Sequence, residues 1–173
     1  MNPTLLRTYR ASEEKRKMLM AMLSLVPDQK FHYRPPGKWS VSQILSHLVQ
    51  AEKASLDYMK KKFLGIEQAG DTGKIEALKF FLLKISQRLP LKYKAPDILG
   101  KNDPPSLPLP EIEKNWALLR EDLRSFLEMF GDVQLRRKVY RHVIAGRLNV
   151  VQAIEFFDEH LDHHLPQIKR LLQ

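Results

Sequence analysis

Apolar residues recur at helical spacing in four separate stretches of this 173-residue chain, and that pattern constrains the fold more than any other feature. The stretches cover about 3–26, 40–65, 111–131 and 149–172. In each, apolar residues three or four positions apart form one stripe, so each stretch predicts a helix with one buried face. Four such faces must cover one another, which predicts an all-α protein built as a four-helix bundle.

Local signals predict where these helices begin and end. Pro3 suits the first turn of the first helix. Ser40 is a favourable N-cap for the second helix, and Gly65 is expected to end it. The third helix is expected after Pro110, with acidic residues in its first turn, and Asn149 is expected to cap the fourth.

A long crossover separates the second and third helices. Apolar residues within 75–90 predict a short extra helix there, which would form either a dimer face or a lid. Five prolines within 94–110 predict an irregular loop. Residues 139–147 predict an extended turn before the last helix. Because domains usually hold about 100–200 residues, we expect residues 1–173 to form a single domain.

Composition excludes several classes of protein. The absence of cysteine excludes a disulfide scaffold, a Cys-ligated zinc finger, an iron–sulfur cluster and a cysteine nucleophile. No segment approaches the ~18 uninterrupted apolar residues of a membrane span. The first residues lead into a charged stretch rather than into the apolar core of a signal peptide. We therefore expect a cytoplasmic protein that does not enter a membrane.

The chain is basic, with 29 Lys and Arg against 20 Asp and Glu, a net charge of +9. The excess is concentrated in the crossover 60–94 and in residues 136–147. Both segments lack the interleaved aromatic residues of a single-strand binder, so we do not expect nucleic acid as a partner. The charge is explained either by a solvated basic face or by attraction of an anionic substrate to the crossover.

Three of the six histidines fall within residues 160–164. Each residue advances about 100° around a helix, which places His160 and His164 one turn apart on the flank of the apolar stripe. Both rings can then reach one ion. Gln167 shares that flank and offers a hydrogen-bonding neighbour, whereas His163 lies toward the polar side.

A third ligand has to come from another helix, and His47 on the second helix is the candidate. It lies off the apolar stripe, beside small residues and Tyr58. Neutral imidazoles from His47, His160 and His164 would hold one divalent ion and leave a coordination position open, as catalytic metal sites do. Imidazole suits Zn²⁺, Ni²⁺ and Fe²⁺, so the ligands do not select the metal. The competing interpretation is that these are ordinary core and surface histidines.

Other residues near this candidate site have two interpretations each. Glu52 lies within the apolar stripe of the second helix, where its carboxylate needs a partner. That partner would be an arginine or a helix end, or Glu52 would serve the site. Tyr58 and His163 are either ordinary packing residues or members of the pocket. The Glu-x-x-His motif of carboxylate-bridged di-iron bundles is absent around the four histidines on the two helices.

Two segments resemble a known family. Residues 38–48, Lys-Trp-Ser-Val-Ser-Gln-Ile-Leu-Ser-His-Leu, resemble the signature at the start of the second helix in the DinB/YfiT-like superfamily. Residues 160–168, His-Leu-Asp-His-His-Leu-Pro-Gln-Ile, are similar to its last-helix motif, His-x-x-x-His-x-x-Gln-Ile. Residues 141–148 are similar to the short stretch that often precedes that helix. Helix order and the long crossover also match, so the resemblance spans nearly the whole chain.

The resemblance implies an up-up-down-down four-helix bundle, commonly a homodimer, with one divalent ion held by three histidines. By motif position these are His47, His160 and His164. Family members include thiol-dependent S-transferases, a maleylpyruvate isomerase and proposed metal-dependent hydrolases, which implies a small-molecule substrate or a thiol cosubstrate. The alternative is a binding module of the same fold without turnover. Pro166 departs from an ordinary helix and predicts a kink just after His164.

Overall fold

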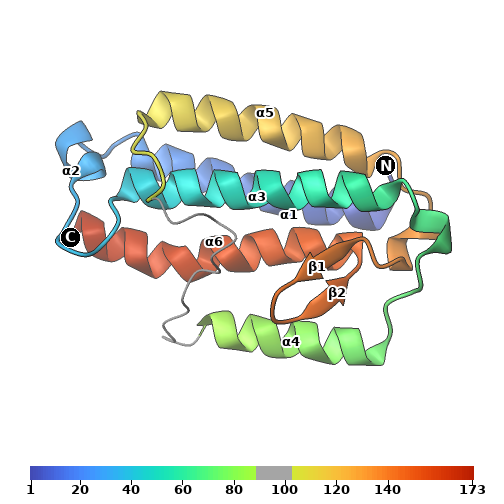
Figure 1. The fold of residues 1–173 in the computed structure, drawn as a ribbon. Coiled ribbons are helices and arrows are strands. Elements are labelled where there is room, and N and C mark those ends of the chain that lie inside the picture. The colour runs from blue at the N-terminus through green and yellow to red at the C-terminus, as the bar shows by residue number, and fades with distance from the viewer. Residues whose placement is uncertain (89–102) are drawn as a thin grey trace.

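The computed structural model describes residues 1–88 and 103–173, and it is mostly helical. Four long helices lie side by side along the length of the molecule (Figure 1): α1 (Pro3–Leu23), α3 (Val41–Phe63), α5 (Leu109–Leu127) and α6 (Val150–Leu172). α1 and α3 each pack against both α5 and α6. The expectation of a mainly α-helical protein is confirmed.

Shorter elements connect the long helices. They are α2 (Asp28–His32), η1 (Ile66–Gln68), α4 (Lys74–Arg88), η3 (Gln134–Arg136), β1 (Tyr140–His142) and β2 (Gly146–Leu148). α4 is the extra helix predicted in the crossover. β1 and β2 pair antiparallel as a small hairpin, with Arg141 opposite Arg147, where the sequence predicts an extended turn. Within the proline-rich segment 94–110, residues 94–102 lie outside the described residues, and 103–108 have no regular secondary structure.

Hydrogen bonds between helices fix their directions. The hydroxyl of Ser42, at the start of α3, donates a hydrogen bond to the carbonyl oxygen of Leu107, just before α5. The ammonium of Lys60, near the end of α3, donates a hydrogen bond to the carboxylate of Asp122 in α5. Residue numbers therefore rise together along α3 and α5, which run parallel. Figure 1 shows α1 and α6 running the opposite way. α4, which follows α3 in the sequence, also runs the opposite way and lies along the bottom of the view, packed against α6. In chain order, α1, α3, α5 and α6 therefore run up, down, down and up. The up-up-down-down order implied by the family resemblance is wrong.

The capping signals in the sequence are confirmed. Ser40 and Asn149 each form a reciprocal capping box with a glutamine three residues later, Gln43 and Gln152. Each box satisfies two backbone N–H groups that the first turn leaves without helical partners.

Other helix boundaries differ from the sequence prediction. α1 ends at Leu23 rather than near residue 26, and α5 begins at Leu109 with Pro110 inside its first turn. By contrast, α6 continues past Pro166 to Leu172 as the sequence predicts, and the kink at Pro166 stays a prediction. α2 was not predicted, because its five residues are too few to show helical periodicity.

Two clusters of buried apolar side chains fill the interior. One includes Met59, Phe126 and Ile154. The other includes Leu48, Trp116 and Leu161. His47 directly precedes Leu48 and His160 directly precedes Leu161, so the candidate ligands border the second cluster. Packing of α3 against α6 thereby places histidines from two helices at one position in the fold.

Candidate metal centre

His47 of α3 and His160 and His164 of α6 converge on one point. Each offers one ring nitrogen, and these three atoms all lie within 4.8 Å of one another. The ring centroids are 5.1 Å apart for His47 and His160, 5.3 Å for His47 and His164, and 5.0 Å for His160 and His164. The structure thus brings together the three histidines that the sequence selects.

Packing holds these rings in place. His47 is 8% exposed and His164 9%. The Trp39 ring lies 5.1 Å from the ring of His47, and Phe156, one turn before His160 on α6, stacks nearly parallel on the His160 ring at 5.7 Å. Neither aromatic residue is among those that the sequence predicts for the site. The signals that could have found them are the position of Trp39 in the 38–48 motif and the i, i+4 spacing of Phe156 and His160.

Burial keeps the three imidazoles neutral. It lowers the pKa of His47 and lowers the pKa of His160 well below its ordinary value, with His164 and His47 lowering the pKa of His160 further. Burial also lowers the pKa of His164 to about 4, although the hydrogen bond with Gln167 opposes this. At neutral pH each ring therefore carries a nitrogen lone pair, which is the form of histidine that binds metals.

Gln167 orients one of the rings. Its Oε1 lies 3.1 Å from Nδ1 of His164, and since an amide oxygen can only accept, Nδ1 carries the proton. The lone pair of His164 is then on Nε2. Outer partners of metal-binding histidines commonly fix the tautomer in this way. The sequence prediction that Gln167 lies beside the site agrees with this contact, and a role in metal binding stays a prediction.

The donor set fits a divalent transition-metal ion. Nε2 of His47 and Nε2 of His160 lie 3.3 Å apart. Two nitrogens bound to one tetrahedral Zn²⁺ at about 2.0–2.1 Å would be separated by roughly 3.3–3.4 Å. The separation of these two uncharged rings therefore matches that of two ligands of one such ion.

The other predicted pocket residues lie at different distances from the triad. His163 is adjacent, with its ring centroid 5.2 Å from that of His164. The ring of Tyr58 lies 6.2 Å from the ring of Tyr140 in the hairpin.

The carboxylate of Glu52 points to α5, where it accepts hydrogen bonds from Trp116 at 2.9 Å and from Arg120 at 2.7 Å. An arginine partner was one of the two alternatives for Glu52. Roles of Glu52, Tyr58 and His163 in a metal site stay predictions.

His142 adds a histidine close to the triad. Its ring lies 4.4 Å from Phe156, and its Nδ1 accepts hydrogen bonds from the backbone N–H groups of Ile144 and Ala145. Burial lowers the pKa of His142 to about 4. The two backbone bonds occupy Nδ1, so His142 supports the hairpin and the aromatic wall beside His160.

Comparison with known protein families agrees with this geometry. The family model of the DinB superfamily matches residues 11–168. The chain belongs to the DinB superfamily. The DinB match includes all three histidines and all or most of each of the four long helices. No curated protein matches the chain significantly.

The described part of this DinB protein also bears on its environment. None of its described helices is both long enough and apolar enough to span a bilayer. The cytoplasmic location expected from the sequence stays a prediction.

Proposed function

We propose that this DinB-superfamily protein binds one divalent metal ion, Zn²⁺, Ni²⁺ or Fe²⁺, through His47, His160 and His164 and is a metal-dependent enzyme. The supporting observation is the convergence of three neutral ring nitrogens from two helices within 4.8 Å. The proposed reaction is of the thiol-dependent S-transferase or hydrolase type. When bound, such an ion lowers the pKa of a coordinated water or thiol and so supplies a nucleophile at neutral pH.

The protein's own residues would prepare this chemistry. Trp39 and Phe156 lie against two of the ligand rings and limit the access of water to them. Gln167 keeps Nε2 of His164 unprotonated. Three protein ligands leave a position for a small-molecule substrate or a thiol cosubstrate, which a closed four-ligand structural site would not.

The architecture that accompanies this function is a single domain, residues 1–173, built as a four-helix bundle with a long crossover. We propose that it forms a homodimer through α4. Five large apolar side chains on α4 are between 45% and 67% exposed: Ile75, Leu78, Phe81, Leu82 and Ile85. They recur at helical spacing as one stripe, and a second copy of the same stripe is a self-complementary partner for it.

Elemental analysis tests the metal site. The protein would be purified without a metal-affinity tag, and wild type would be compared with a His160→Ala/His164→Ala variant. We expect about one equivalent of a transition metal in the wild type and almost none in the variant. Equal metal content in the two proteins would reject the site.

Activity screening then separates an enzyme from a binding module. Thiol transfer and ester or amide hydrolysis would be measured with metal-free and metal-loaded protein. Turnover that requires both the metal and the histidines supports the enzyme. Consistent inactivity, together with ligand-induced thermal stabilisation of the metal-loaded protein, would instead favour a non-catalytic metal-binding or ligand-binding module.

A further inference from the structure

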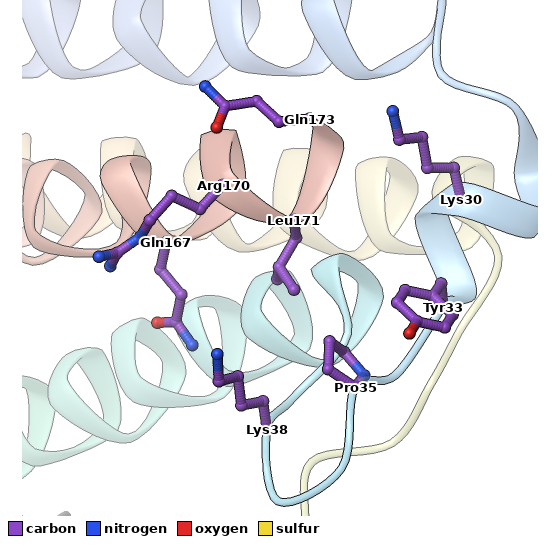
Figure 2. A pocket seen from close by; sticks show the side chains of 8 residues that line it. All are labelled: Lys30, Tyr33, Pro35, Lys38, Gln167, Arg170, Leu171 and Gln173. Carbon is purple, nitrogen blue, oxygen red and sulfur yellow. The ribbon is translucent and has the colours of Figure 1, made fainter.

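A pocket of about 680 Å³ lies between the end of α6 and the segment that follows α2. This volume is within the range of small-molecule sites. Figure 2 shows its lining side chains, with Gln167 extending from α6 toward the loop that carries Lys38. Pro35 and Leu171 contribute apolar surface, and Tyr33 contributes a phenol.

The pocket is positively charged. Lys30, Lys38 and Arg170 line it, and no acidic side chain does. Among the described residues none of these three forms an ion pair, whereas Lys15, Lys60 and Lys84 each pair with a carboxylate. Three unneutralised cations around one concavity create a local potential that attracts anions.

Two connections place this pocket next to the histidine triad. Gln167 lines the pocket and at the same time accepts the hydrogen bond from Nδ1 of His164. Lys38 lines the pocket and directly precedes Trp39, whose ring lies 5.1 Å from that of His47. A ligand in the pocket would therefore be separated from the triad by a single layer of side chains.

We infer that this pocket, beside the histidine triad, binds the carboxylate end of a small organic acid. The planar guanidinium of Arg170 matches a carboxylate, and Lys38 adds a point charge. Gln167 retains its amide N–H groups as donors, because only its Oε1 is used by His164. The apolar surface of Pro35 and Leu171 favours an acid with a carbon skeleton over an inorganic anion.

Titration of the metal-free protein tests the pocket. Amide resonances of isotope-labelled protein would be followed by NMR during addition of sodium glutarate, sodium benzoate or inorganic phosphate. We expect saturable shifts at pocket-lining residues, with at least one carboxylate binding more tightly than phosphate. Lys38→Gln/Arg170→Gln should weaken carboxylate binding by at least tenfold.

A matched control has the same net charge. Lys17 and Lys169 are exposed and do not line the pocket, so Lys17→Gln/Lys169→Gln should change carboxylate binding by less than twofold. Equal weakening in the two double variants would show only general charge attraction and would overturn the inference. So would the absence of saturable shifts, or tighter binding of phosphate than of both carboxylates.

Metal content measured on the same protein before the metal is removed distinguishes this failure from failure of the proposed function. A protein that binds metal at the histidines but no carboxylate in the pocket rejects the inference alone. A protein that binds carboxylate in the pocket but no metal at the histidines rejects the proposed function and leaves the inference intact.

Discussion

Nε2 of His47 and Nε2 of His160 face each other at 3.3 Å, although 113 residues separate them along the chain. Each ring is packed against an aromatic residue, Trp39 or Phe156, and burial lowers both pKa values. Two buried imidazoles that meet nitrogen to nitrogen can share at most one hydrogen bond. With His164 beside them they instead form a set of donors suited to one ion.

Loss of His47 should weaken metal binding strongly. His47→Ala removes the only ligand from α3, so the affinity should fall by more than the roughly 10–100-fold typical of losing an outer partner. Competition with a chromophoric chelator measures this. His32→Ala is the control, because His32 contacts Ser106 and Asp28 instead. Equal affinity of wild type and His47→Ala protein would show that α3 contributes no ligand.

Gln167 should affect metal affinity through His164. Gln167→Leu removes the acceptor for Nδ1–H and frees the other tautomer, so metal affinity should fall by about 10–100-fold while the fold persists. Gln50→Leu replaces an exposed glutamine of α3 and should have no such effect. The same chelator competition provides the measurement, and unchanged affinity in Gln167→Leu would remove Gln167 from the site.

The buried Glu52–Arg120 pair should contribute to stability. Burial raises the pKa of Glu52, and the nearby Arg120 opposes that rise by favouring the carboxylate. Glu52→Gln leaves the guanidinium of Arg120, which is 2% exposed, without its nearest charged partner. We expect a loss of about 3 kcal/mol in the free energy of unfolding by urea.

An exposed ion pair provides the comparison for Glu52→Gln. Lys53 and Asp57 form an ion pair on the surface of α3, so Asp57→Asn should lower the free energy of unfolding by less than about 1 kcal/mol. Similar losses in the free energy of unfolding for Glu52→Gln and Asp57→Asn would show that burial does not make the Glu52–Arg120 pair more important for stability.

His142 should make the metal-free protein less stable as the pH falls. Its pKa is about 4 in the folded protein and the ordinary 6.5 when unfolded, so between these values the unfolded chain binds more protons. Through this residue, lowering the pH from 8 to 5 should therefore lower the free energy of unfolding by up to about 2 kcal/mol.

His142→Asn isolates that contribution. Asparagine keeps an acceptor for the backbone N–H groups of Ile144 and Ala145 but does not titrate. Urea unfolding at pH 8 and pH 5 should show a smaller pH dependence in the variant than in the wild type. An unchanged dependence would mean that His142 is not held neutral by the fold.

The exposed stripe on α4 should control oligomeric state. Leu78→Glu/Leu82→Glu places charges one turn apart in the stripe, so a dimer should convert to a monomer of 20.2 kDa by light scattering. Leu118→Glu alters a side chain on α5 that is 60% exposed and should leave the dimer intact. A wild type that is monomeric at all concentrations tested would reject the dimer.

Local interactions made part of this structure predictable. The capping boxes at Ser40 and Asn149 depend on residues three positions apart, and the shared face of His160 and His164 depends on one helical turn. Such features need only neighbouring residues and the period of the helix. His47 is the candidate for the third ligand from its place on the second helix, and the DinB motifs point to the same residue. The fold brings it within reach of the other two histidines.

Sequence alone therefore determined the main helices and which histidines face inward, because periodicity and capping are short-range properties of the backbone. Tertiary structure decided that α3 and α5 run parallel, that Glu52 pairs with Arg120, and that Lys38 and Arg170 line one pocket beside the triad. These relationships join residues between 62 and 132 positions apart. Their distances depend on how complete helices pack, and no local pattern records that packing.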